Sequence, residues 1–383
     1  MKWGSRPLLG IVFAGALGMS QSAALAEEAK EPWLKVVVPI EIQNDGNFKS
    51  DDRSNKLNDL YTTVEPEITV GILPGLSFYA HAVLETTRDP RSGENRYFRS
   101  HGIYLQDLYL QYKGTLTSDE PNAFKFRVWG GKFGPNFGTA WDKAPGIYGA
   151  DFAEDYEFVE RLGFGAALIL EHGALGTHTL SASTFVLDRS VLSGSAITKR
   201  TRPVLADGGP SNTRGLKSFH VTLEGEKIPG LEGLTYHVSF IHQSVRGGPD
   251  ERGVAVALGY EAELSGYTIK PILEYVHIFD ADGVSGQARN YLTTGFSIEK
   301  DNWEFTLSHT FRHTHTPMAG TVRDNLFATS IGYTFKKALF ENDLGVAVGY
   351  SYRNEDSIAT HTVGVLLTYT FCLAVRTKCD DDK

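Results

Sequence analysis

Polar and apolar residues alternate along most of this chain, and this period of two constrains the fold more than any other feature. Between residues 34 and 43, for example, Leu, Val, Val, Ile and Ile occupy every second position. Such alternation marks a β-strand with one apolar and one polar face. It recurs in about sixteen segments, which we place at 34–43, 61–71, 77–86, 103–112, 124–133, 159–171, 178–187, 216–224, 234–243, 253–262, 267–279, 290–299, 303–312, 325–335, 344–354 and 360–371. The predicted class is all-β.

The connections between these segments fall into two kinds. Short ones occupy 73–76, 172–177, 228–233, 263–266 and 300–302, whereas long polar ones occupy 44–60, 87–102, 188–215 and 313–324. Transmembrane barrels have short turns on one side of the membrane and long loops on the other. In a soluble β-sandwich there is no physical reason for short turns and long loops to lie at opposite ends. We therefore predict a closed transmembrane antiparallel β-barrel of about sixteen strands.

Residues 1–26 have the composition of a cleaved signal peptide. Lys2 and Arg6 precede the apolar run Leu8–Met19, and Ala24-Leu25-Ala26 supplies the small residues of a cleavage site. A retained membrane anchor is the alternative. We predict an exported protein in which residues 27–371 form an outer-membrane barrel and residues 372–383 form a C-terminal extension.

The charge balance of the chain is acidic, with 37 Lys and Arg against 46 Asp and Glu. This balance argues against a nucleic-acid-binding surface. After the N-terminal segment there is no apolar run of about 18 residues, so no membrane-spanning helix is predicted.

The stretch from Gly130 to Glu160 follows neither a strand period nor a helix period. It is too long for a passive connection in a compact protein, and its glycines permit sharp bends. We predict that residues 134–158 fold into an enclosed space as a constriction loop. Its charged residues are Asp142, Lys143, Asp151, Glu154, Asp155 and Glu157, and its predicted anchors are Phe137, Trp141, Tyr148 and Phe152.

Part of this stretch resembles a known family. Gly-Lys-Phe-Gly-Pro-Asn-Phe-Gly-Thr-Ala-Trp-Asp, followed by Ala-Asp-Phe-Ala-Glu-Asp-Tyr-Glu, is similar to the constriction segment of alphaproteobacterial porins. The resemblance, to Gram-negative general porins of sixteen strands, covers Trp33–Phe371. It implies a loop that enters the pore after the fifth strand, where the strand order independently places residues 134–158. It also implies a homotrimer of water-filled channels surrounded by outer-membrane lipid and lipopolysaccharide.

The C-terminus partly departs from this family. The family's last strand ends on an aromatic residue that the outer-membrane assembly machinery recognises, and Tyr369-Thr370-Phe371 fits that pattern. The extension beyond Phe371 contains the only two cysteines, Cys372 and Cys379. In an oxidising compartment they can form a disulfide. Two free thiols, or a partly non-native terminus, are the alternatives, because Asp380-Asp381-Asp382-Lys383 resembles a truncated protease site.

Pore radius, wall dipoles and fixed charge determine what a channel conducts. The predicted wall residues are Glu65, Glu67, His81, Asp107, Arg127 and Arg161. General porins place a basic cluster opposite the loop, but here the second to fourth strands are acidic. We expect passive diffusion of ions and small hydrophilic solutes with a weak preference for cations. No cofactor is expected, although calcium between the loop carboxylates is an alternative.

Other functions stay open. A channel selective for a sugar, phosphate or another small solute would carry an aromatic ladder or a basic track, and Trp129 and Tyr109 alone do not make a ladder. A structural or adhesive barrel with a blocked lumen is a further alternative.

Two sets of histidines could serve catalysis or metal binding. His81, His220 and His237 lie on predicted lumen faces, but no motif joins them to a nucleophile, so no enzymatic activity is expected. His309, His313 and His315 share one strand face, where a divalent metal is the alternative to solvated loop histidines.

Overall fold

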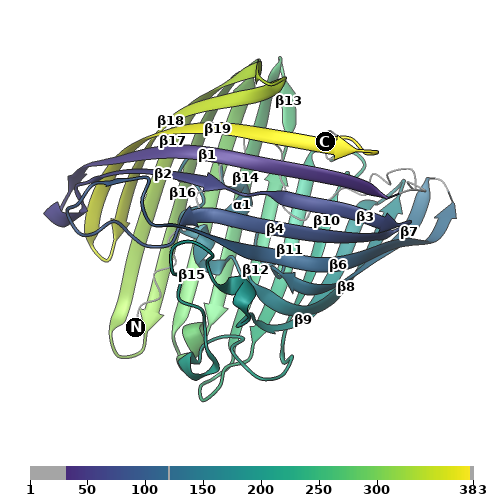
Figure 1. Ribbon diagram of the computed structural model, residues 1–383, viewed down its shortest axis with the longest axis horizontal. Helices are drawn as coiled ribbons and strands as arrows, with labels where there is room; N and C mark the ends of the chain where they lie inside the picture. The colour runs from purple at the N-terminus through teal and green to yellow at the C-terminus, as the bar shows by residue number, and fades with distance from the viewer. Residues whose placement is uncertain (1–31, 120, 380–383) are drawn as a thin grey trace.

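The computed structural model describes residues 32–119 and 121–379. Within them the chain forms one closed antiparallel barrel of sixteen strands, which confirms the predicted class and strand number (Figure 1). The predicted signal peptide lies outside the described residues. No helix in these two ranges is long and apolar enough to cross a bilayer.

Two of the sixteen strands are interrupted, so each carries two labels. The strands are β1 (Trp33–Ser50), β2 with β3 (Asn58–Val64, Glu67–Leu73), β4 (Leu76–Thr86), β6 (His101–Asp119), β7 (Asn122–Phe133), β8 (Arg161–His172), β9 (Gly176–Leu187), β10 (Ser218–Glu226), β11 (Leu234–Gln243), β12 with β13 (Glu251–Tyr260, Ala262–Leu264), β14 (Tyr267–Phe279), β15 (Ala288–Lys300), β16 (Trp303–Thr316), β17 (Gly320–Leu339), β18 (Asn342–Glu355) and β19 (Ile358–Val375). Pro66 accounts for the break between β2 and β3, because proline has no N–H for a ladder hydrogen bond.

Small elements occupy the connections. The two-residue strand β5 (Arg96–Tyr97) pairs with β2 in parallel orientation. The helical turns are η1 (Arg53–Asn55), α1 (Ala140–Lys143), η2 (Ala153–Tyr156), η3 (Val191–Ser193), η4 (Leu205–Asp207) and η5 (Ala281–Gly283). Both α1 and η2 lie in the predicted constriction loop.

The first and last strands close the barrel. β1 pairs with β19 from Leu34↔Val375 to Ser50↔Thr360, with one shift of register near Asn47. No open sheet edge is left at this seam, as a strand in lipid requires. Figure 1 shows the short turns at one end of the barrel and the long loops at the other.

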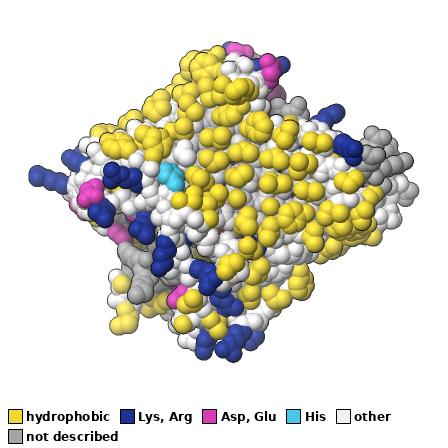
Figure 2. Space-filling model, viewed as in Figure 1, with side chains coloured by type: hydrophobic (Ala, Val, Ile, Leu, Met, Phe, Trp, Pro, Cys, Tyr) yellow, Lys and Arg dark blue, Asp and Glu magenta, His cyan; other side chains and the backbone are white. Residues whose placement is uncertain are grey.

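Side-chain alternation gives the barrel two different surfaces. On the outside, Val128, Phe164 and Leu168 are 42%, 56% and 43% exposed, whereas inward-facing Ser183 and Thr222 are buried. Figure 2 shows hydrophobic side chains spread across the flank of the barrel. Exposed apolar surface of this extent suits lipid and not water.

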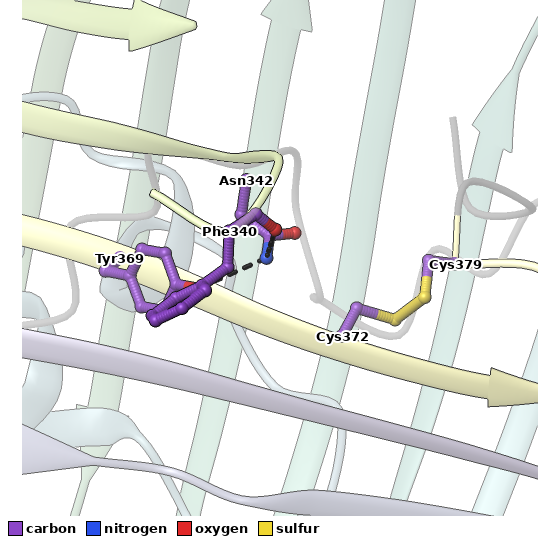
Figure 3. The surroundings of a disulfide bond; sticks show 5 residues. All are labelled: Phe340, Asn342, Tyr369, Cys372 and Cys379. Carbon is purple, nitrogen blue, oxygen red and sulfur yellow. Dashed lines mark hydrogen bonds between the residues drawn. A yellow bond between two sulfur atoms is a disulfide. The ribbon is translucent and has the colours of Figure 1, made fainter. Parts of the chain in front are cut away.

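The last strand continues four residues beyond Phe371, to Val375, and ends beside a disulfide between Cys372 and Cys379 (Figure 3). Of the three sequence-based interpretations of the cysteines, the structure has the disulfide. Cys372 lies opposite Val37 in the β1–β19 ladder. The disulfide therefore ties Cys379 to the seam of the barrel.

Replacing both cysteines with serine should loosen this end of the seam. A disulfide that closes so short a loop stabilises by about 2–3 kcal/mol on chain-entropy grounds. We expect faster amide hydrogen exchange at residues 372–375 and 34–37, with unchanged exchange near the middle of β19. Hydrogen-exchange mass spectrometry measures both. Equal exchange at the strand ends in the two proteins would show that the disulfide restrains nothing there.

Candidate constriction site

A long segment between β7 and β8 lies inside the barrel. β7 is the fifth barrel strand, and residues 134–160 follow it before β8 begins at Arg161. The hydrogen bonds that join this loop to the wall go to β10, β11, β14, β15, β16, β18 and β1. The loop therefore lies against one side of the lumen.

The first part of the loop packs on β10 to β12. Phe137 is fully buried, and its ring occupies the space in which a side chain at Gly253 would lie. Asn136 donates to Glu224 at 3.0 Å and accepts from Thr222 at 2.6 Å through its carbonyl oxygen. Glycine at 253 thus provides room for an aromatic anchor.

Glu274 on β14 binds two separate parts of the loop. Its carboxylate accepts from the backbone N–H groups of Thr139 and Ala140 at 2.5 and 3.0 Å, and from the Tyr156 hydroxyl at 2.6 Å. Its side chain is buried. Because α1 begins at Ala140 and η2 ends at Tyr156, one carboxylate holds both ends of the inserted segment.

Replacing Glu274 with alanine should release the loop from β14. The change removes at least three hydrogen bonds to a charged group and leaves their donors unpaired, a cost on the order of 3 kcal/mol or more. We expect larger open-channel current noise and new protease cleavage within residues 139–156. Glu274→Gln, which keeps one acceptor oxygen, should show an intermediate effect. An alanine variant with wild-type noise and wild-type cleavage would contradict this role.

The middle of the loop follows a row of small residues on the wall formed by β16 to β19. Gly364, Gly349, Ser330 and Thr306 lie side by side on β19, β18, β17 and β16 in the ladder register. Loop residues 145–148 pass directly over this row, and a side chain added at Gly349 would meet Ile147. Small inward side chains on neighbouring strands leave a track that the loop fills.

Tyr148 fixes the end of this track to the first strand. Its ring is buried against Gly364, and its hydroxyl donates to Asp45 on β1 at 2.6 Å. Gln43 and Tyr61 also donate to Asp45. The loop is thus tied to both strands that form the closing seam.

Two wall arginines pair with loop carboxylates. Arg312 donates to Asp155 at 2.8 Å, and Arg353 donates to Asp151. Both guanidinium groups lie over the ring of Phe152. Burial raises the pKa of Asp151 to about 7, although Arg353 opposes that shift. These arginines neutralise loop acids that would otherwise carry charge into the lumen.

The wall formed by β2, β3, β4 and β6 has an acidic group around His81. His81 lies 3.2 Å from Asp107 and 4.0 Å from Glu65, and Glu67 accepts from Tyr79 at 2.8 Å. The loop contributes Glu157 to the same region: burial, with repulsion from Glu65 and Asp107, raises its pKa to about 8. Carboxylates from the loop and from the wall therefore act on one another.

The remaining charged residues lie elsewhere around the loop. Arg127 stacks on Trp129 at 4.8 Å, and Arg161 donates to the Val159 carbonyl at 2.5 Å close to the start of β8. The other charged residues of the loop lie on its helical turns: Asp142 and Lys143 on α1, and Glu154 on η2 next to Asp155. Burial, and to a smaller extent repulsion from Asp151, raises the pKa of Glu154. Trp141 is half-buried and donates to the Phe137 carbonyl at 3.1 Å.

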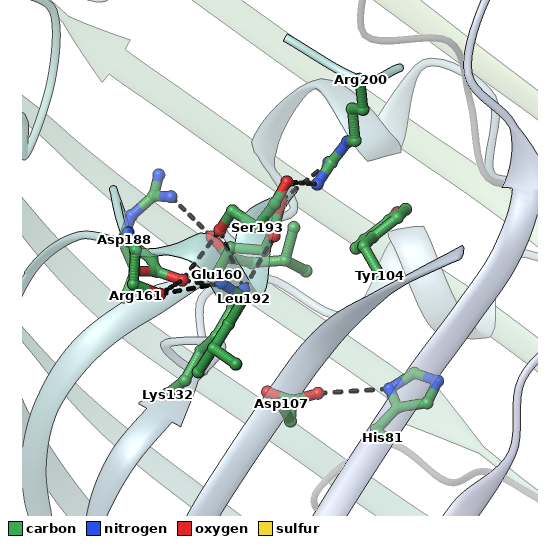
Figure 4. Close-up of polar contacts among 12 residues, drawn as sticks. His81, Tyr104, Asp107, Lys132, Glu160, Arg161, Asp188, Leu192, Ser193 and Arg200 are labelled. Carbon is green, nitrogen blue, oxygen red and sulfur yellow. Dashed lines mark hydrogen bonds and ion pairs between the residues drawn. The ribbon is translucent and has the colours of Figure 1, made fainter. Parts of the chain in front are cut away.

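A second loop, residues 188–217, lies over the end of the barrel where the long loops are. It joins β9 to β10 but reaches β6, where the Ala196 N–H donates to the Ile103 carbonyl at 2.9 Å. Figure 4 shows the polar network at its base, in which buried Lys132 lies 2.9 Å from both Glu160 and Asp188. Arg200 from the same loop pairs with Glu160 at 2.7 Å. This network joins the second loop to the root of the constriction loop.

Neither the loop carboxylates nor the histidines form a metal cluster: among residues 32–119 and 121–379, no three His, Cys, Asp or Glu side chains are arranged to hold an ion. Ser183 contacts His220 at 2.6 Å, but His220 Nε2 is buried without a partner in the described protein. No orienting group completes a nucleophile–base arrangement there.

Sequence reasoning named the loop's own aromatic residues but missed their partners on the wall. Glu274 and Asp45 hold the loop, and neither belongs to a motif. A signal for Glu274 exists, because it occupies an inward position between the apolar inward residues Ile272 and Val276. A carboxylate in such a place needs hydrogen-bond donors from another element.

Closure, the lipid-facing surface and the inward loop define a porin-like transmembrane barrel. No protein-family model and no curated protein sequence matches the chain.

Three solved structures illustrate what the fold is similar to. Salmonella typhi OmpF, in complex with daunomycin, matches with a TM-score of 0.55 and 12% identity over 88% of this chain and 97% of that chain. The Acinetobacter baumannii channel DcaP matches with a TM-score of 0.50 and 12% identity over 89% and 96%. A Vibrio cholerae OmpT mutant lacking loop L8 matches with a TM-score of 0.50 and 8% identity over 88% of this chain and 99% of that chain. At these identities the likeness concerns the fold.

Proposed function

We propose that this chain is an outer-membrane porin, a water-filled channel for passive diffusion of ions and small hydrophilic solutes with a weak preference for cations. One observation carries the proposal: a loop is fixed along one side of the lumen and presents Glu157 toward the acidic wall around Asp107. Above the pKa of Glu157, about 8, the narrowing carries fixed negative charge on both sides, and such charge favours the passage of cations. The Acinetobacter baumannii protein DcaP, whose structure has a similar fold, is described as an outer membrane channel, which agrees with this proposal.

Two of the wall cations that oppose this preference are paired with carboxylates. Arg312 contacts Asp155, Asp324 and Glu355, and Arg353 contacts Asp151 and Glu355. No continuous basic track is therefore presented to a solute along these strands. This arrangement favours a general cation-preferring pore over a channel for anions such as phosphate.

Single-channel recording of the purified barrel in a planar bilayer tests the proposal. We expect stepwise conductance in potassium chloride and a reversal potential in a salt gradient that indicates cation preference. A substrate-selective channel would instead lose current when its solute is added. Absence of steps would support the structural or adhesive alternative.

We also propose that residues 1–26 are removed during export and that assembly machinery inserts the barrel by recognising its last strand. The mature protein would then begin at Glu27 and appear in the outer-membrane fraction. N-terminal mass analysis of the protein recovered from that fraction checks this. A chain that retains Met1–Ala26 would contradict it.

A homotrimer is proposed from the family resemblance and from the small outward residues Ala80 and Ala82 on β4, which allow close approach of a second barrel. Chemical cross-linking in mild detergent should give bands of monomer, dimer and trimer. Without cross-linker, the trimer band should disappear when the sample is heated. Monomer alone under these conditions would count against the assembly.

A further inference from the structure

The outer surface of β14 to β18 carries polar side chains close to the end with the long loops. Inward neighbours such as Val276, Tyr291 and Leu326 are buried, so strand alternation directs the intervening residues outward. The polar group consists of His277 on β14, Asn290 on β15, His313 on β16, Arg323 and Asn325 on β17 and Asn354 on β18. We call these six residues the polar window.

The window is continuous across the strands. His277, Asn290, His313 and Arg323 lie opposite one another in successive ladders. The next pair, Asn325 and Asn354, lie opposite one another between β17 and β18. Asn290 connects its two neighbours, at 2.5 Å to His277 Nδ1 and 3.4 Å to His313 Nδ1.

Apolar residues border the window on the side of the bilayer centre. Tyr275, Leu292 and Phe327 are 45%, 42% and 38% exposed at the next outward positions. Two of them, Tyr275 and Phe327, are aromatic, and transmembrane barrels place aromatic residues at the membrane interface. The polar window therefore lies at the depth of lipid headgroups and not in the hydrocarbon.

Arg323 is the cation of the window. It is exposed, and among the described residues no carboxylate forms an ion pair with it. A shallow depression beside it is lined by Thr321, Val322, Arg323, Asp356 and Ser357. Asp356 brings one acid to the rim. The nearby acids Asp324 and Glu355 are paired with Arg312.

We propose that the polar window binds the phosphorylated headgroup of an outer-leaflet glycolipid. An exposed guanidinium binds phosphate oxygens through two parallel hydrogen bonds. Imidazole and amide groups beside it can donate to phosphate and to sugar hydroxyls. Barrels place their long loops on the extracellular side, so the lipid at this height belongs to the outer leaflet. The inference rests on the proposed outer-membrane location but not on the ion preference of the pore.

Native mass spectrometry of barrels exchanged into mild detergent with a bis-phosphorylated lipopolysaccharide tests the site. We expect wild-type barrel to retain the glycolipid and the double variant Arg323→Ala/His313→Ala to bind it about tenfold more weakly, as the loss of one charge-assisted contact predicts. Arg323→Lys with His313 intact should bind with intermediate affinity. Arg91→Ala is the matched control, because the Arg91 side chain is 85% exposed on another loop.

A second probe tests the chemistry. The same glycolipid after enzymatic removal of its phosphates should bind wild-type barrel as weakly as the double variant binds the intact lipid. Equal affinity of wild type and double variant for the intact lipid, or equal affinity of wild type for both lipids, would overturn the proposal. Heat-modifiable gel mobility shows that each variant is folded. Single-channel conductance should be the same in all of them, which separates this test from that of the proposed pore function.

Discussion

Deleting residues 144–151 should raise single-channel conductance by about twofold, because conductance follows the cross-section of the narrowest part of the lumen. These residues cover the row of small side chains from Thr306 to Gly364. Once they are removed, water and ions can occupy that side of the barrel. The wall itself keeps its strand pairing, since the row belongs to the ladder and not to the loop.

The shortened loop can still close. α1 and η2 contact each other across the deleted segment, and Glu274 continues to hold both Ala140 and Tyr156. Tyr148→Phe is the control, because it removes only the hydroxyl that donates to Asp45 and keeps the ring in place. We expect near wild-type conductance for this control. Conductance unchanged by the deletion would mean that residues 144–151 do not border the narrowest section.

The strands could be predicted because lipid and water impose opposite demands on the two faces of every strand. For β14, the predicted segment 267–279 matches the observed bounds Tyr267–Phe279, and for β11 the segment 234–243 matches Leu234–Gln243. The longest strands extend beyond the alternating segments. β17, for instance, begins at Gly320 and not near residue 325, because ladder hydrogen bonds persist beyond the hydrocarbon region, where the outward face need no longer be apolar.

The path of the loop could not be predicted in the same way. Its position depends on contacts between residues far apart in the chain, such as Tyr148 with Asp45 and Tyr156 with Glu274. A single sequence contains no period that connects them. The glycines at 253, 349 and 364 acquire their meaning only when the ladder register places them beneath Phe137, Ile147 and Tyr148.

The partners of the charged wall residues could not be predicted from the sequence. The inward positions of Glu65, Glu67, His81 and Asp107 follow from strand parity. The pairing of Arg312 and Arg353 with loop carboxylates does not, because it requires the loop to reach β16 and β18. Both facts bear on ion selectivity, since only charge that is not locally paired acts on a passing ion.

Replacing Glu65, Asp107 and Glu157 with their amides should abolish most of the cation preference. At pH 9, where Glu157 is mostly charged, we expect the potassium-to-chloride permeability ratio to fall about threefold or more, because fixed charge in a narrow, low-dielectric passage acts more strongly than charge at the surface. Distant charges are screened beyond about 8 Å at physiological salt. The matched control is Glu94→Gln/Glu232→Gln/Glu341→Gln, which changes the net charge equally at three exposed positions. A reversal potential measured in a potassium chloride gradient gives the ratio for each protein.

The pH dependence of this ratio has a definite sign. Since burial and repulsion from Glu65 and Asp107 raise the pKa of Glu157 to about 8, its carboxyl group is mostly neutral at pH 6 and mostly charged at pH 9. Cation preference should therefore increase as pH rises through this range. Glu157→Gln alone should flatten the part of the curve near pH 8. Two results would show that the three carboxylates do not line the narrow section. One is a wild-type permeability ratio that stays constant from pH 6 to 9. The other is a triple amide variant that prefers cations as strongly as the surface control does.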